Sequence, residues 1–322
     1  IGPKGDGFVV QMAISGVDHE FQELPAETGK QVISRFKSLS GMDVAKKRTS
    51  QSGAMEVQLE ERVLGLRLGT APCEGGEELS IRVLDPGAEA KPLPGLGLSP
   101  EQADILQEMV GQERGMILFV GSKGSGKTTT IHSLLTAAAS GDRVVMTVED
   151  PVELRIPLAE QLEVRDETGS TFDDLLRRAV EAEPDILYLS EIRDLSSATA
   201  CLDFVKAGHL VVASMDSSNS TTAIFRLERL GITRSGISDA LIGVVGQKLL
   251  KRLCPECRRA RTLSTEESAL LAPFCAELPD QVGQAAGCSA CRGTGYQGQE
   301  GIFEVLRVDA RIRDLIADDQ SI

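Results

Sequence analysis

Tryptophan is absent from this chain of 322 residues, and aromatic residues make up only 3% of it. A hydrophobic core must therefore be built mainly from leucine, valine, isoleucine and alanine. No apolar run approaches the roughly 20 residues that span a bilayer, and no segment resembles a signal peptide. The length suits about two domains of ordinary size, and the apolar and charged contents are those of a globular protein.

Positive charge is also in short supply, because 34 Lys and Arg residues face 48 Asp and Glu residues and leave a formal net charge of −14. A general nucleic-acid binder would carry a basic stripe, so this balance argues against that class without excluding a local basic patch. Internal repeats and low-complexity tracts are missing as well.

A phosphate-binding loop is the most informative motif that is present. Residues 121–128 read Gly-Ser-Lys-Gly-Ser-Gly-Lys-Thr, between an apolar run at 115–120 and helical spacing at 128–139. Glycines let backbone N–H groups converge on phosphates, and the helix dipole adds partial positive charge. Lys127 would reach the β- and γ-phosphates, and the Thr128 hydroxyl would sit on Mg²⁺. The predicted ATP-binding residues here are Gly121, Ser122, Lys123, Gly124, Ser125, Gly126, Lys127, Thr128 and Thr129.

Four of the seven cysteines form two C-x-x-C pairs about 30 residues apart, a spacing typical of zinc sites. They are Cys254, Cys257, Cys288 and Cys291. Disulfides and a redox pair are the alternatives. Four thiolates leave no open coordination position, so we expect a structural role for the metal. Cys73, Cys201 and Cys275 stand alone and are interpreted as packing residues.

The pattern before residue 115 indicates a small α+β region followed by a linker. Residues 1–7 lack periodicity and are interpreted as a cut linker or a remnant of cloning. An amphipathic helix is predicted at 30–40 and strands at 54–59, 63–68 and 79–84. The stretch 85–97 collects prolines and glycines, which predicts a linker. Ser99 and Pro100 should then begin a helix that runs to about Gly111.

From residue 115 onward, short apolar runs alternate with helical spacing, which predicts a mostly parallel sheet covered on both faces. The runs are 115–120, 144–148, 186–189 and 210–213. Nucleotides bind such sheets at the carboxyl ends of the strands. Glu149, Glu191 and Asp216 follow those ends, so we expect them at the same edge as the phosphate loop.

Taken in order, these motifs resemble the secretion-superfamily ATPases, closest to the type II secretion and type IV pilus assembly branch. The similarity covers about residues 8–320. Besides the phosphate loop, the matching segments are the aspartate box at 147–153, Walker B at 184–194, the start of the histidine box at 208–211, the zinc-bearing region at 247–257 and 293–304, and PAS-like segments at 40–48 and 66–72.

The resemblance implies an α/β fold with a RecA-like P-loop core at 100–322, which carries a tetracysteine zinc element at 250–300. A small α+β PAS-like domain at 1–85 and a linker at 86–99 would precede it. The family's further N-terminal domain, which docks to the membrane platform, has no match in this sequence. Members act on the cytoplasmic side of the inner membrane as homo-hexamers, with platform proteins as partners and no nucleic acid.

The resemblance also implies roles for single residues in binding and hydrolysing ATP with Mg²⁺. Glu149 would activate or orient the attacking water, and Glu191 would hold Mg²⁺ through water. Arg67 and Arg82 match arginines that contact the phosphates, and His209 matches a nucleotide-sensing position. The plainer interpretations are solvated loop carboxylates, exposed strand arginines and a structural histidine.

Four departures from the family pattern fall near the nucleotide. Asp216 stands where the family has histidine, and Ser190 stands where glycine precedes the Walker B glutamate. Glu181 stands near a position where the family usually has arginine, and Ala54 stands where it has another arginine. Together they remove positive charge or add negative charge around a polyanion. Three interpretations follow: an active assembly ATPase that the departures could slow; a nucleotide-binding but weakly hydrolysing regulatory or ring subunit; and a zinc-ribbon nucleic-acid motor.

Overall fold

The structure is a computed structural model that describes residues 1–14, 16–88, 90–139, 141–164 and 171–318. These residues group into two compact units. The first comprises residues 1–53, 68–81 and 250–300, and the second comprises residues 54–67, 82–249 and 301–322. These two units do not coincide with the predicted domains at residues 1–85 and 100–322, so the domain bounds stay a prediction. No described helix combines the length and the apolar character that crossing a membrane requires.

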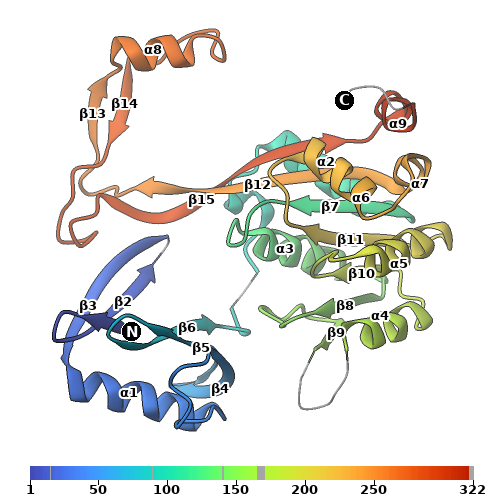
Figure 1. The fold of residues 1–322 in the computed structure, drawn as a ribbon. Helices are drawn as coiled ribbons and strands as arrows, with labels where there is room; N and C mark the ends of the chain where they lie inside the picture. Colours follow the sequence, from blue (N-terminus) through green and yellow to red (C-terminus); the bar gives the residue numbers. More distant parts are fainter. Residues whose placement is uncertain (15, 89, 140, 165–170, 319–322) are drawn as a thin grey trace. The chain divides into compact units, whose positions relative to one another are not determined.

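A large, mostly parallel sheet forms the centre of the second unit (Figure 1). In spatial order its strands are β15 (Tyr296–Arg307), β12 (Leu241–Leu253), β7 (Gly115–Val120), β11 (Leu210–Met215), β10 (Ile186–Leu189), β8 (Val145–Glu149) and β9 (Ala159–Glu163). Neighbouring strands from β12 to β9 pair in parallel. Every residue of β7, β10 and β11 is buried, which explains their unbroken apolar sequences.

Helices cover both faces of this sheet. One core cluster takes residues from α4 (Phe172–Glu181), α5 (Leu195–Lys206), α6 (Ser220–Arg229), α7 (Arg234–Ala240) and α9 (Ala310–Ala317). The other takes residues from the 3-10 helix η1 (Leu93–Leu96), α2 (Pro100–Val110) and α3 (Lys127–Ala139). Strand β7 serves both clusters, because Leu118 belongs to the first and Phe119 to the second. The predicted two-sided parallel sheet is therefore confirmed.

The proline-rich stretch is not a free linker along its whole length. Its second half forms η1, and Leu93 and Leu98 are buried in the core against α2 and α3. Ser99 then caps α2: its hydroxyl accepts the N–H of Gln102, and the Gln102 side chain accepts the N–H of Ser99. Leucines at this spacing anchor the chain, which composition alone did not reveal.

The N-terminal residues begin with a sheet rather than a linker. Strands β1 (Gly2–Lys4), β2 (Gly7–Ile14) and β3 (Val17–Pro25) pair antiparallel, which corrects the expectation for residues 1–7. Helix α1 (Ala26–Leu39) follows. A further sheet has the order β4 (Gln51–Leu59), β5 (Arg62–Cys73) and β6 (Gly76–Leu84), so the three strands predicted in this region are present.

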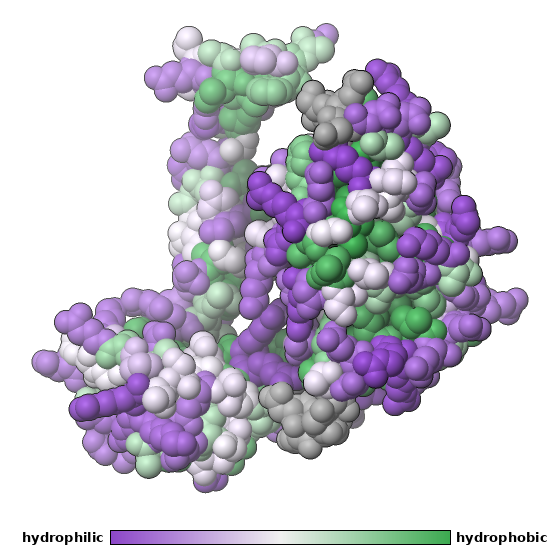
Figure 2. All heavy atoms as spheres, turned by 45° about the vertical axis from the view of Figure 1, so that its right-hand side comes forward, coloured by the Kyte–Doolittle hydropathy of each residue, from purple (hydrophilic) through white to green (hydrophobic). Residues whose placement is uncertain are grey.

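Residues 250–300, which we call the tetracysteine segment, bury few side chains. Strands β13 (Arg259–Thr262) and β14 (Gln281–Gln284) pair antiparallel, and α8 (Thr265–Leu271) connects with them at one end (Figure 1). Helix α8 buries none of its residues. Leu270 is 71% exposed and Phe274 is 86% exposed, and Figure 2 shows apolar side chains gathered at this end.

Candidate nucleotide site

The phosphate loop, residues 121–128, lies between β7 and α3 as the sequence predicts. Gly121 has a φ of +155°, and a Cβ there would stand 2.4 Å from the carbonyl oxygen of Gln247. Gly126 has a φ of +89°, and a Cβ there would stand 2.7 Å from the Gln247 side-chain nitrogen. Both positions therefore require glycine. Strand β12 shapes the loop through Gln247, and the sequence analysis did not predict this contact.

The phosphate loop and the neighbouring Gln247 of β12 carry polar groups that are unpaired among the described residues. The buried atoms Ser125 Oγ and Gln247 Oε1 have no hydrogen-bond partner among the described residues. The first N–H groups of α3 also lack acceptors within the helix, as at any helix start. A cradle too narrow for a Cβ, with unpaired polar groups and a helix N-terminus, fits a phosphate group. Thr128, in the first turn of α3, suits a magnesium ligand.

The ammonium group of Lys127 folds back onto its own loop. Its Nζ donates to the carbonyl oxygens of Gly121 at 2.6 Å and Ser122 at 3.2 Å. It also lies 3.0 Å from Asp216 Oδ1. Asp216 directly follows β11, the strand that pairs with β7. An acid thus neutralises the cation that was expected to bind the β- and γ-phosphates.

The carboxylate of Glu149, predicted as catalytic, is only 1% exposed at the end of β8. Its Oε1 accepts hydrogen bonds from Thr147 Oγ1 at 2.7 Å and from Gln161 Nε2 at 2.9 Å. Its Oε2 lies 3.3 Å from His132 Nε2. A buried carboxylate needs such partners. Glu149 therefore reaches the predicted edge of the sheet, but its carboxylate is enclosed there.

Sequence reasoning missed all three partners of Glu149. Gln161 reaches it because β8 and β9 pair in a register that sets Gln161 opposite Thr147. His132 lies in α3, and its ring contacts Tyr188 edge-on at a centroid distance of 6.2 Å. Burial, together with nearby carboxylates, raises the pKa of Tyr188 well above its usual value. A histidine inside a helix of small and apolar residues was the one signal that could have pointed to this network.

Glu191, the second predicted catalytic glutamate, stands open at the same edge. It follows β10 by two residues, its side chain is 37% exposed, and its Oε2 lies 3.4 Å from Arg193 Nε. Arg193 also pairs with Asp150 at 3.0 Å and lies over the ring of Phe172. The two glutamates therefore share an edge but differ in access, because Glu191 faces solvent and Glu149 does not.

Arg67 and Arg82, predicted to contact the phosphates, are each engaged by a carboxylate. Arg67 Nη2 lies 3.4 Å from Glu163 Oε1, and Arg82 pairs with Glu153. Both arginine side chains are about half exposed, and exposed ion pairs of this kind are weak. Either arginine can therefore exchange its partner for a phosphate at small cost, and their phosphate contact stays a prediction.

His209 is not brought to the phosphate loop. It precedes β11, whereas Asp216 follows it, so His209 lies at the amino edge of the sheet and the loop at the carboxyl edge. Its ring stacks on Phe204 at a centroid distance of 4.5 Å. Within one chain His209 therefore packs against α5, and its nucleotide-sensing role stays a prediction.

The four predicted metal-ligating cysteines form one cluster, and their sulfur atoms all lie within 4.8 Å of one another. Three Sγ–Sγ distances are 3.8 to 3.9 Å. A tetrahedron with Zn–S bonds of about 2.3 Å has edges of about 3.8 Å. Burial alone would raise the pKa of Cys291, but N–H groups of Cys288 and Gly295 point at its sulfur and lower the pKa to about 6. The distances between the sulfur atoms therefore fit a zinc ion.

Comparison with known proteins identifies the family of the whole chain. Residues 1–322 match the family described as "Type II/IV secretion system protein". The chain belongs to this family. The type II secretion system protein E of Aeromonas hydrophila is 33% identical over 309 residues, which are 96% of this chain and 61% of that protein. The type IV pilus assembly ATPase PilB of Thermus thermophilus is 34% identical over 322 residues, 100% of this chain and 36% of that protein. The chain thus spans about three fifths or less of these two relatives.

A solved structure of the pilus retraction motor PilT with bound ADP has the same fold. Its TM-score is 0.65 at 22% identity, over 98% of this chain and 81% of that chain. The likeness confirms an α/β fold with a mostly parallel central sheet. The predicted family and the predicted α/β fold with a mostly parallel sheet are therefore confirmed, whereas the PAS-like domain stays a prediction.

Proposed function

We propose that this chain is the ATP-binding motor part of a type II secretion or type IV pilus assembly machine. It hydrolyses ATP to drive the assembly of pilins or pseudopilins from the cytoplasmic side of the inner membrane. The phosphate loop at the carboxyl edge of a parallel sheet, with its glycine cradle and Glu191 open at the same edge, carries this proposal. The names of the two relatives supply the choice of machine.

The proposed site divides the work among residues at this edge. The loop and Lys127 bind the triphosphate, while Thr128 and Glu191 hold Mg²⁺, the latter through water. Bound magnesium would neutralise negative charge on the triphosphate. Glu149 orients the attacking water from a position fixed by its buried partners. A general base can reach its target through one water, which suits an enclosed carboxylate.

Several broader assignments belong to the same proposal. The tetracysteine cluster holds a structural zinc ion, supported by its sulfur–sulfur distances. Residues 100–322 form a RecA-like core, and residues 1–85 form a PAS-like domain. The working form is a homo-hexamer that meets membrane platform proteins, in keeping with the machines for which the relatives are named.

One observation favours a second function, that of a nucleotide-binding subunit with weak hydrolysis. Asp216 forms an ion pair with Lys127. A carboxylate beside a triphosphate also repels it unless a cation lies between them. Such a subunit would act in the ring through the conformation that ATP stabilises rather than through turnover.

Steady-state ATP turnover with Mg²⁺, at a protein concentration high enough for ring assembly, tests the proposal. The wild type is compared with Lys127→Ala and with Lys123→Ala, a matched lysine in the same loop. Turnover that is lost only in Lys127→Ala supports the motor. Tight ATP binding without turnover in the wild type supports the second function. Unchanged ATP affinity in Lys127→Ala overturns the site itself.

A further inference from the structure

A pocket of about 350 Å³ lies within the first compact unit. Small-molecule sites range from about 300 to 1,000 Å³. Its apolar lining includes Phe8, Ile33 and Pro72. The Phe8 ring lies so close to α1 that a Cβ at Gly29 would stand 2.3 Å from it, so glycine is required there. The pocket therefore has an apolar wall that is packed against the helix.

The charged lining of this pocket is basic, against the trend of the whole chain. Lys30 and Lys37 come from α1, and Lys47 and Arg48 from the loop that follows it. Glu77 is the acidic lining residue. Asp and Glu outnumber Lys and Arg by 48 to 34 in the sequence, so a group of cations around one cavity is a local reversal. Such a reversal attracts anions.

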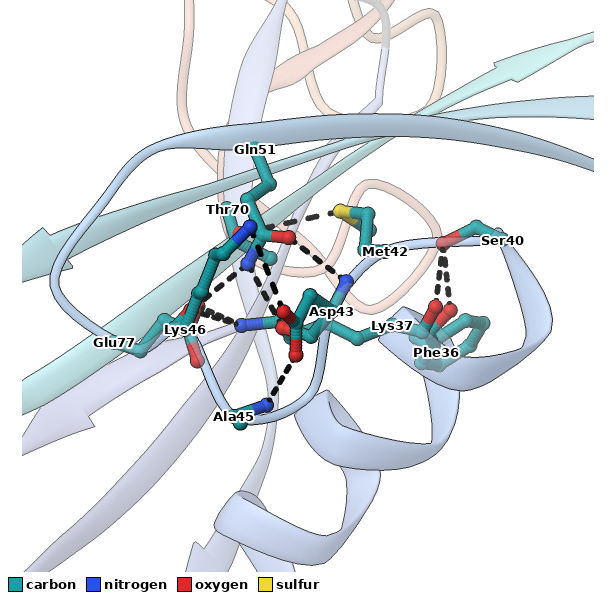
Figure 3. A network of polar contacts seen from close by, with 10 residues as sticks. All are labelled: Phe36, Lys37, Ser40, Met42, Asp43, Ala45, Lys46, Gln51, Thr70 and Glu77. Carbon is teal, nitrogen blue, oxygen red and sulfur yellow. Dashed lines mark hydrogen bonds and ion pairs between the residues drawn. The ribbon is translucent and has the colours of Figure 1, made fainter.

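Glu77, the acidic lining residue, already forms an ion pair with Lys37, the most buried of the lining cations. Lys37 Nζ lies 2.6 Å from Glu77 Oε1, both side chains are almost fully buried, and the ammonium also donates to the Lys46 carbonyl at 2.8 Å (Figure 3). Lys30, Lys47 and Arg48 have no ion-pair partner within the described part of the chain. These three side chains therefore give the pocket a net positive charge, because the charges of Lys37 and Glu77 cancel within their buried ion pair.

The loop that carries two of these cations is fixed in place by polar contacts (Figure 3). Gln51 accepts the N–H of Asp43 and donates to the carbonyl oxygens of Asp43 and Lys46. The Asp43 carboxylate accepts the N–H of Ala45. Lys37 holds the same Lys46 carbonyl from inside. A ligand that binds beside this loop thus pays little entropy for ordering it.

We propose that this pocket binds an organic phosphate. A phosphate group accepts hydrogen bonds from Lys30, Lys47 and Arg48, and arginine grips phosphate with two parallel N–H groups. The apolar part of the ligand packs against Phe8 and Ile33. A phospholipid head group and a free phosphorylated metabolite share this chemistry. The site does not depend on the proposed motor function, since it can be occupied whether or not ATP is hydrolysed.

Cys73 lines the pocket and gives a local readout. The rate of its alkylation by iodoacetamide is followed by mass spectrometry, with half-buried Cys275 in the same chain as internal reference. The probes are glycerol 3-phosphate, dihexanoyl phosphatidic acid and vesicles of phosphatidylglycerol. We expect at least one probe to slow alkylation at Cys73 and leave Cys275 unchanged. Protection by glycerol 3-phosphate identifies a free metabolite as the source, and protection only by the lipids identifies a head group.

Two arginine variants decide whether the pocket is responsible. Arg48→Gln removes a lining cation, and we expect it to raise the half-protecting concentration about tenfold. Arg35→Gln removes the same charge from an exposed position on α1 outside the lining and should leave that concentration unchanged. Equal effects of both variants, or no protection by any probe, overturn the proposal. Equilibrium dialysis with radiolabelled glycerol 3-phosphate and dihexanoyl phosphatidic acid repeats the comparison without relying on the thiol.

Discussion

Strand β7 buries all six of its residues, whereas helix α8 of the tetracysteine segment buries none. The two regions also place their functional groups by different means. At the phosphate-loop edge, buried parallel strands end together and their loops begin there. In the tetracysteine segment, the buried points include Cys254 and Cys291, two of the clustered cysteines themselves. In the first region the fold positions the site, whereas in the second the proposed zinc site would hold the fold together.

The energetic reason for this contrast is the amount of apolar surface that each region removes from water. Burial contributes about 25 cal/mol per Å² of apolar surface, which the large sheet gains on both faces. The tetracysteine segment leaves Leu270 and Phe274 exposed and lacks this source. Structural zinc sites supply apparent binding free energies of about 10–16 kcal/mol, which is enough to order a segment without a core.

Removal of the proposed zinc ion should have the largest effect, because that ion would order the tetracysteine segment. We expect a chelator, or Cys291→Ser, to abolish amide-exchange protection over residues 254–295 and to leave β7, β10 and β11 protected. Hydrogen exchange with mass spectrometry measures both regions at once. Cys275→Ser, a cysteine outside the cluster, is the matched control and should change neither. Protection that persists without zinc would show that packing, not the metal, orders the segment.

Truncation of one leucine in each region should give the next largest difference. Leu118→Ala in β7 removes a fully buried side chain and should lower the free energy of unfolding of the sheet by about 2–5 kcal/mol. Leu270→Ala in α8 removes an exposed side chain and should change it by less than about 0.5 kcal/mol. Urea denaturation measures both. A similar loss in the two variants would contradict the contrast.

The buried network around Glu149 should show a smaller effect. Thr147→Val keeps the shape of the side chain but removes the hydroxyl that donates to Glu149. Leaving a buried acceptor with one donor fewer costs about 1–3 kcal/mol of unfolding free energy. Thermal unfolding measures it, with Thr262→Val on the exposed strand β13 as the matched substitution. An unchanged unfolding temperature in Thr147→Val would mean that Gln161 and His132 are sufficient hydrogen-bond partners for the Glu149 carboxylate.

Release of Lys127 should have the smallest effect. Asp216→Asn removes the charge that holds Lys127, and partly exposed ion pairs are worth up to about 1 kcal/mol, so ATP binding should tighten by up to about fivefold. Isothermal titration calorimetry measures the affinity. Asp203→Asn breaks the exposed Asp203–Lys206 pair on α5 and serves as control. Weaker ATP binding in Asp216→Asn would show that the acid helps the site rather than opposing it.

Local sequence determined a large part of this protein. The strands at 115–120 and 186–189, the helix that begins at Pro100, the phosphate loop and the two cysteine pairs were all predicted, because each depends on neighbouring residues. An apolar run, a capping serine or a glycine that needs positive φ has the same consequence wherever the chain folds. The order of these motifs also identified the family.

Tertiary structure alone decided which groups meet. Asp216 reaches Lys127 because β11 lies next to β7, and Gln161 reaches Glu149 because β8 and β9 pair in one register. His209 was assigned by its place in a motif, yet its position before a strand puts it at the opposite edge. Residues far apart in the sequence come together through strand order, register and the packing of helices, and no short pattern encodes these.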